Sequence, residues 1–88
     1  MAKYDPLFRH LVTADAAKPV EMTFDEIERL VGPLPASATK YSAWWNNEQS
    51  DTTHVQALAW INAGREVEMV DRAAGRVRFS AARWRRGS

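Results

Sequence analysis

The chain has 88 residues, of which 45% are hydrophobic, 26% are charged and none is cysteine. This length allows one small domain, and this composition excludes wholesale disorder. The lack of cysteine excludes disulfide bonds, thiolate catalysis and cysteine-ligated zinc sites.

The first element we expect is a helix over residues 5–14, with Asp5 as its cap and Pro6 in its first turn. Its apolar residues recur with the spacing of one buried helical face: Leu7, Phe8, Leu11 and Val12. Residues 20–24 then alternate apolar and polar side chains, which predicts a short strand.

A second helix follows this strand directly. Thr23 and Glu26 have the spacing of a capping box, and Met22 and Ile27 have that of a hydrophobic staple. The helix ends at Gly32, which is followed by a proline.

Two further helices are predicted over residues 36–46 and 54–63, with a polar loop between them. Thr53 and Gln56 have the spacing of a second capping box at the start of the later helix. Gly64 supplies a left-handed stop at its end.

Residues 65–71 and 76–80 alternate in polarity and predict a β-hairpin, with Gly75 available for its turn. Strict alternation places Val67 and Met69 on one face of the first strand and Val70 on the other. We expect a single domain over residues 1–80 and a frayed, arginine-rich tail over residues 81–88.

This order of elements predicts a small α+β fold that resembles a winged helix-turn-helix domain: helix, short strand, three helices and a C-terminal hairpin. In that arrangement the helix pair spans 24–31 and 36–46, the short strand pairs with the hairpin, and the hairpin is the wing. The simplest winged helix lacks a helix at 54–63, so the likeness is an analogy.

Short motifs are spread along the chain, namely Tyr4 to Leu7, Thr23 to Glu28, Leu34 to Ala38, Trp44 to Asn47, His54, Ala59-Trp60, Ala63-Gly64 and Val77 to Phe79. Taken together they resemble a family of small bacterial proteins and fused modules of uncharacterised function. The resemblance covers residues 4–80 and implies no particular activity.

The formal net charge is only +1, but residues 65–88 hold seven arginines against three acids. Such asymmetry points to a polyanionic partner, and guanidinium groups suit bidentate phosphate contacts. The alternative is a solvated tail that aids solubility. The arginines that we assign to double-stranded DNA are Arg72, Arg76 and Arg78 on the hairpin, and Arg83, Arg85 and Arg86 in the tail.

The predicted helix over residues 36–46 would enter the major groove. Its hydroxyls and its one cation suit phosphate and base-edge contacts, and the asparagine at its end suits adenine. The alternatives are an ordinary solvent-facing helix and an asparagine that merely ends it. The residues assigned to DNA are Ser37, Thr39, Lys40, Tyr41 and Asn46.

We therefore expect a DNA-binding module, a small bacterial transcriptional regulator, in which a homodimer would add contacts that a small monomer lacks. The rival hypothesis is a protein-interaction module, an adaptor or an antitoxin-like partner, anchored by an exposed Trp44 or Trp45. Large aromatics also fill small cores. Because adjacent helical residues point about 100° apart, we expect one of this pair to pack inward and the other to lie nearer the surface.

We expect no catalysis, no cofactor and no metal. The chain has no phosphate-cradling glycine loop, no metal-ligand spacing and no triad-like set, and His10 and His54 are far apart in sequence. No apolar run approaches ~18 residues, and the N-terminus lacks the apolar core of a signal peptide. A cytoplasmic protein with no membrane partner is therefore expected.

Overall fold

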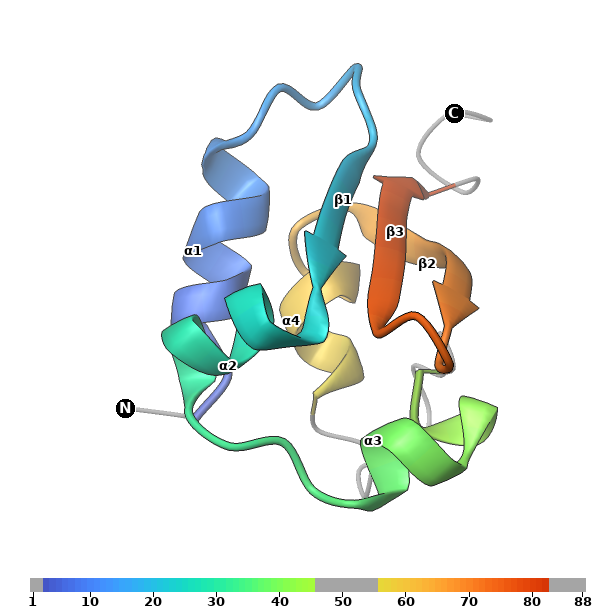
Figure 1. Cartoon of the computed structure of the whole chain (residues 1–88). Coiled ribbons are helices and arrows are strands. Elements are labelled where there is room, and N and C mark those ends of the chain that lie inside the picture. Colours follow the sequence, from blue (N-terminus) through green and yellow to red (C-terminus); the bar gives the residue numbers. More distant parts are fainter. Residues whose placement is uncertain (1–2, 46–55, 83–88) are drawn as a thin grey trace.

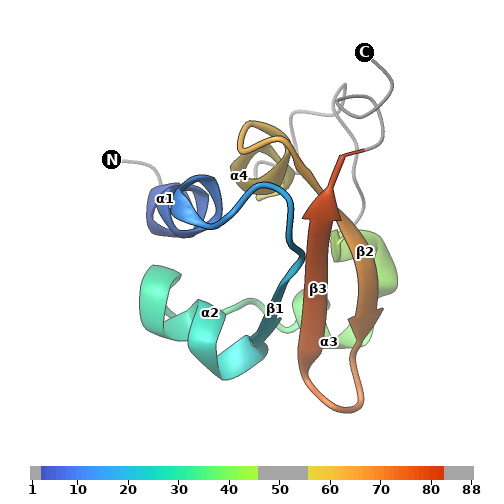
Figure 2. The same ribbon diagram turned by 90° about the horizontal axis from the view of Figure 1, so that it is seen from above.

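The computed structural model describes residues 3–45 and 56–82, and its elements follow the predicted order (Figure 1). Helices α1, α2 and α4 lie on one side of a three-stranded antiparallel sheet, and α3 lies at the end of the sheet that carries the hairpin turn (Figures 1 and 2). The small α+β fold class is confirmed. The elements are α1 Asp5–Thr13, β1 Val20–Thr23, α2 Phe24–Val31, α3 Ser37–Lys40, the 3-10 helix η1 Ser42–Trp45, α4 Ala57–Ile61, β2 Arg65–Asp71 and β3 Arg76–Ala81.

The sheet has the strand order β1-β3-β2, so the short strand before α2 pairs with the hairpin as predicted. Met22 of β1 lies opposite Val77 of β3, and Val67 of β2 lies opposite Phe79. These side chains belong to the core or pack against it. Burial of this apolar face is the main stabilising contribution to such a small domain.

Local signals in the first half of the chain are largely confirmed. Glu26 N–H donates to Thr23 Oγ1 at 3.1 Å, and Thr23 N–H donates to Glu26 Oε1 at 2.8 Å, which completes the capping box. The bond from the Thr23 backbone is the main cause that lowers the pKa of Glu26. Helix α2 ends at Gly32, whose φ of 87° is the left-handed conformation that favours glycine. The assignment of Asp5 as the cap of α1 is wrong, because Asp5 lies inside the first turn and Tyr4 precedes it.

The continuous helix predicted over residues 36–46 is wrong. Helix α3 ends at Lys40, Tyr41 is extended, and η1 follows. The indole N–H of Trp45 donates to the Ala38 carbonyl oxygen at 2.8 Å, which is the acceptor that a longer helix would offer to Ser42. Serine, threonine and aromatic residues are also weak helix formers, so this segment has little intrinsic preference to oppose the break.

The break at Tyr41 brings Trp45 into the core, where it is 2% exposed. Its ring stacks on Phe24 with centroids 5.2 Å apart and on Trp60 with centroids 5.9 Å apart. Trp44 is half-buried, and its ring centroid lies 4.6 Å from that of Trp45. One of the adjacent pair therefore packs inward and the other lies nearer the surface, as the helical geometry predicted.

Strict alternation in β2 is also wrong. The register shifts between Val67 and Met69, so that Met69 lies opposite Arg78 and Val70 lies opposite Val77. The irregularity is a β-bulge, in which one extra residue reverses the facing of those that follow. Met69 is consequently 46% exposed, whereas Val67 and Val70 both pack against the core.

Arg65, at the start of β2, is 2% exposed and donates to backbone carbonyls from three parts of the chain. Its acceptors are Leu11 O at 3.2 Å, Asp15 O at 2.9 Å, Lys18 O at 2.9 Å and Phe79 O at 3.4 Å. Burial lowers the pKa of this guanidinium. One of the seven C-terminal arginines thus ties α1 and the segment before β1 to the sheet, and it does not face a partner.

Helix α4 spans Ala57–Ile61 and is therefore shorter than the predicted helix over residues 54–63, of which the structure describes residues 56–63. The proposed cap Thr53 lies outside the described residues, while Gln56 is buried and donates to the Trp44 carbonyl oxygen at 2.9 Å. Gly64 has a φ of 77°, which confirms the predicted left-handed stop. None of the helices in the described ranges is long and apolar enough to span a membrane.

The last strand runs one residue beyond its predicted end. Ala81 belongs to β3, and Ala82 is fully buried and donates its N–H to the Gly64 carbonyl oxygen at 3.0 Å. These two residues, which the sequence placed in a frayed tail, therefore pack with the domain. Residues 83–88 of that tail lie outside the described part.

Candidate nucleic-acid interface

Helix α3 and the hairpin turn meet at one end of the sheet. Arg72 Nη1 donates to the carbonyl oxygen of Lys40 at 2.6 Å and lies 3.5 Å from that of Thr39. These carbonyls close the last turn of α3, where a cation is favoured. The contact joins residues that are 32 positions apart in sequence and holds the Arg72 guanidinium against the backbone of Lys40.

Lys40 at the end of α3, Arg72 in the hairpin turn and Arg76 at the start of β3 are cations of the elements that meet here, and we call this group the basic corner. All three are exposed, with Arg76 at 61% of its side chain. Tyr41, beside Lys40, is 62% exposed. Asp71 lies in the same turn, where its carboxylate accepts the Ala74 N–H at 3.1 Å. An exposed aromatic ring beside cations is the kind of surface that contacts a sugar-phosphate backbone.

The other residues of α3 that were predicted to contact DNA are less available than Lys40. Ser37 is half-buried, and the Thr39 hydroxyl donates to the Ala36 carbonyl oxygen at 3.0 Å, within its own turn. Only one turn of helix is present, which is too short to lie along a major groove. Asn46 and the tail arginines Arg83, Arg85 and Arg86 lie outside the described residues.

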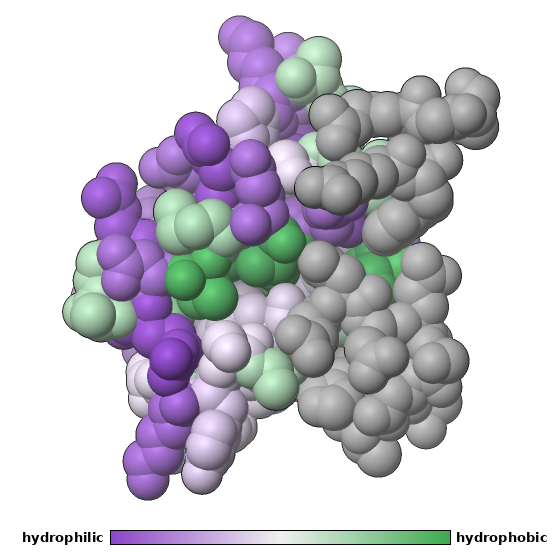
Figure 3. Space-filling view, turned by 90° about the vertical axis from the view of Figure 1, so that its right-hand side faces the viewer, coloured by the Kyte–Doolittle hydropathy of each residue, from purple (hydrophilic) through white to green (hydrophobic). Residues whose placement is uncertain are grey.

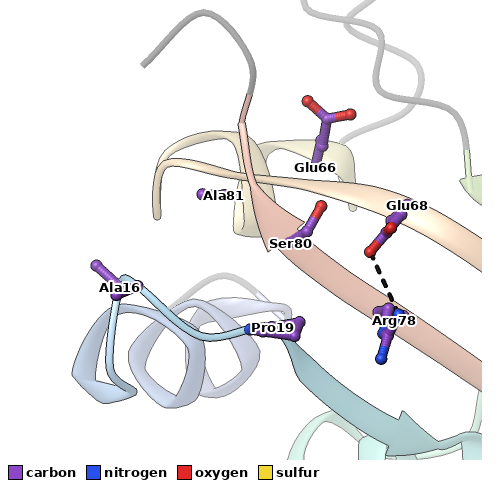
Figure 4. A pocket seen from close by; sticks show the side chains of 8 residues that line it. Ala16, Pro19, Glu66, Glu68, Arg78, Ser80 and Ala81 are labelled. Atoms are coloured by element: carbon purple, nitrogen blue, oxygen red, sulfur yellow. Dashed lines mark ion pairs between the residues drawn. The ribbon is translucent and has the colours of Figure 1, made fainter. Parts of the chain in front are cut away.

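The two outward-facing arginines of β3 lie among carboxylates. Arg78 Nη2 is 2.9 Å from Glu21 Oε2, and Arg78 Nη1 is 3.8 Å from Glu68 Oε1. Figure 4 shows Arg78 and Glu68 directed toward one another across the outer face of β3 and β2, beside Ser80 and Glu66. Arg76 Nη2 is 3.8 Å from Glu21 Oε1. Among the residues that the structure describes, the outer sheet face is therefore a mixed-charge surface without a continuous basic stripe.

Charge over the described ranges is balanced, with nine basic and nine acidic side chains. On the face that Figure 3 shows, a small hydrophobic area lies in the coloured part of the surface, with hydrophilic side chains to its left and above it. Whatever attraction this part of the chain has for a polyanion must come from local clusters such as the basic corner, because it carries no net charge.

The sequence analysis did not predict that Glu21 pairs with the arginines of β3 or that Arg65 is a buried structural residue. Alternation in residues 20–24 did place Glu21 on the outer face, but its partner depends on the register, which sets it opposite Arg78. Arg65 was counted with the other arginines because nothing local marks it as buried. Its acceptors come from α1, from the segment before β1 and from β3.

Of the two tryptophans that the rival hypothesis names as anchors, Trp45 is 2% exposed and Trp44 is half-buried. An apolar groove runs instead between α1 and α4. Its lining residues are Lys3, Tyr4, Asp5, Phe8, Leu58, Ala59 and Asn62. Burial raises the pKa of Tyr4, whose ring also lies 6.2 Å from that of Trp44.

A family model described as Domain of unknown function (DUF7662) matches residues 4–82. The chain belongs to this family. The match confirms the resemblance to an uncharacterised small domain family, and it runs from α1 through β3 to the buried Ala82. The DUF7662 match thus contains the basic corner and ends before the tail arginines. No curated protein and no solved structure matches the chain.

Proposed function

We propose that this chain binds double-stranded DNA through phosphate contacts at the basic corner. The observation that carries the proposal is the hydrogen bond of 2.6 Å from Arg72 to the Lys40 carbonyl oxygen. It fixes a helix end and a hairpin turn to one another, so that Lys40, Arg72 and Arg76 present their charge from one end of the sheet. Three such cations can contact the backbone of one duplex together.

The topology supports the same proposal. In winged-helix domains the helix-turn-helix and the wing address one duplex from the same side of the fold. Here the strand order β1-β3-β2 and the approach of α3 to the hairpin turn agree with that arrangement. Topology alone is a weak argument for function, and the proposal therefore depends on the cations.

The proposed mode of binding is led by phosphates and not by bases. Phosphate contacts position a protein on DNA, whereas base contacts give sequence preference. Because α3 offers one turn of helix, we do not extend the proposal to a sequence-specific transcriptional regulator. Two to three phosphate contacts predict a salt slope of about −2 to −3 in a plot of log binding constant against log salt, the shallower slope applying where Glu21 holds Arg76. A second copy on the same duplex would double it.

The test is a fluorescence-anisotropy titration of a random-sequence duplex of about 20 base pairs at several salt concentrations. We expect measurable binding at about 50 mM salt that weakens as salt rises. Lys40→Ala should reduce the slope by about one. Lys18→Ala is the matched control, because Lys18 is an exposed lysine outside the basic corner.

Two outcomes bear on the location of binding. A variant with Arg83, Arg85 and Arg86 replaced by alanine should retain part of the affinity, since the basic corner remains. If that variant loses all binding while Lys40→Ala changes nothing, the basic corner is not the site. If the unaltered chain fails to bind at about 50 mM salt, the DNA proposal is wrong, because phosphate contacts supply nearly all non-specific affinity.

A further inference from the structure

Glu21 contacts both outward-facing arginines of β3. Its two carboxylate oxygens lie 2.9 Å from Arg78 Nη2 and 3.8 Å from Arg76 Nη2. The strand register produces this arrangement, because Glu21 lies directly opposite Arg78 and its neighbour along the face, Thr23, lies opposite Arg76. One carboxylate therefore serves two cations, one of which belongs to the basic corner.

We infer that Glu21 weakens the binding of DNA by competing with phosphates for Arg76 and Arg78. The inference rests on the proposed function, since it describes how the same surface is regulated by its own acidic residue. A phosphate that approaches β3 must displace the Glu21 carboxylate before it pairs with either arginine. The unaltered domain thus offers fewer free cations to DNA than its sequence contains.

Arg78 is the arginine held most closely. Its side chain is 38% exposed, and it has Glu21 on one side and Glu68 at 3.8 Å on the other. Figure 4 shows the Glu68 contact on the outer sheet face, and the side chains of Arg78 and Glu68 are 38% and 49% exposed. Within the described ranges, the buried Nε of Arg78 has no hydrogen-bond acceptor. The carboxylates therefore leave one guanidinium donor unsatisfied, and a phosphate could serve it after a small movement of the side chain.

The pairs with Glu21 are poorly placed to serve the fold alone. Glu21 is 48% exposed, and both arginines are also partly open to solvent. Exposed ion pairs contribute little to folding stability and are screened by salt. Removing the charge of Glu21 should therefore leave the domain folded while it frees two cations for phosphates.

The test compares Glu21→Gln with the unaltered chain in the same duplex titration, with circular dichroism to verify the fold. We expect affinity at about 100 mM salt to rise roughly threefold to tenfold, and the salt slope to steepen by one to two because each new phosphate contact adds about 0.9. Glu68→Gln, which removes the more distant carboxylate, should give a smaller rise. Adding Arg76→Ala and Arg78→Ala to Glu21→Gln should abolish the gain.

The matched control is Asp15→Asn, which makes the same change in net charge. Asp15 pairs with neither β3 arginine in the described ranges, and its side chain accepts the Ala17 N–H at 2.9 Å, which asparagine can also do. If the DNA affinity of Glu21→Gln rises no more than that of Asp15→Asn while the unaltered chain binds DNA, the inferred role of Glu21 is wrong and the proposed function stands. If neither the unaltered chain nor Glu21→Gln binds at about 50 mM salt, both proposals are wrong.

Discussion

The indole N–H of Trp45 donates to the carbonyl oxygen of Ala38 at 2.8 Å, seven residues earlier in the chain. This bond takes an acceptor away from the helix backbone and coincides with the end of α3 at Lys40. The free carbonyls at that end are the ones that Arg72 contacts. The packing of one core tryptophan is thus connected to the geometry of the basic corner.

Trp45→Phe tests this connection. Phenylalanine retains an aromatic ring between Phe24 and Trp60 but cannot donate to Ala38, which leaves a buried acceptor without its partner. We expect a loss of about 1–3 kcal/mol in the free energy of unfolding, measured by urea denaturation. Trp44→Phe, at the half-buried neighbour, should cost less. Equal losses would contradict a special role for the Trp45 indole N–H.

Arg65 should be the most costly arginine to replace in the described part of the chain. Arg65→Met removes the donors to four backbone carbonyls, and a loss of about 3 kcal/mol is expected. Lysine retains the charge but has a shorter reach and fewer fixed donors, so the loss of stability in Arg65→Lys should lie between zero and that of Arg65→Met. Arg9→Met on the exposed face of α1 is the control and should change stability by less than about 0.5 kcal/mol. A stable Arg65→Met domain would show that these bonds contribute little.

The β-bulge in β2 makes opposite predictions for two neighbouring residues. Val70→Asn places a polar amide against the core and should cost about 2 kcal/mol, whereas Met69→Asn alters an exposed position and should cost less than about 0.5 kcal/mol. Chemical denaturation of both variants measures the difference. If Met69→Asn were the more destabilising of the two, strict alternation would be supported and the bulge would be contradicted.

The capping box predicts a pH dependence. Because hydrogen bonds from Thr23 lower the pKa of Glu26 below its ordinary value of 4.5, folding favours the ionised carboxylate. Its contribution is fully present above pH 4.5 and is lost as the pH falls through the lower pKa of the folded state. The difference in unfolding free energy between the unaltered chain and Glu26→Gln should be constant from neutral pH down to about pH 5.5 and shrink below it. A constant difference down to pH 3 would contradict this linkage.

Features that depend on neighbouring residues were predictable from the sequence. The capping box at Thr23, the glycine stops at Gly32 and Gly64 and the hairpin each follow from short-range signals, and the pairing of β1 with the hairpin followed from the order of elements. The break at Tyr41 was missed because it accompanies the packing of Trp45 on Phe24 and Trp60, which are distant in sequence. The bulge after Val67 was missed because it depends on the pairing register between β2 and β3, which alternation alone does not show.

The candidate site was predictable as a set of residue types but not as a surface. The alternation of residues 76–80 agrees with the outward orientation of Arg76 and Arg78. Their charge balance depends on Glu21 and Glu68, which come from two other strands, and a sequence without its register does not show which charges meet. The same limit explains why the buried Arg65 was grouped with exposed arginines.

The most direct test of the central claim is an NMR titration of the 15N-labelled chain with a duplex of about 20 base pairs at about 50 mM salt. The account predicts that the backbone amides with the largest shifts belong to Lys40, Tyr41 and residues 71–76, and that added salt reverses these shifts. Absence of any shift, or shifts confined to the groove between α1 and α4, would contradict it. The second result would favour a protein partner at that groove.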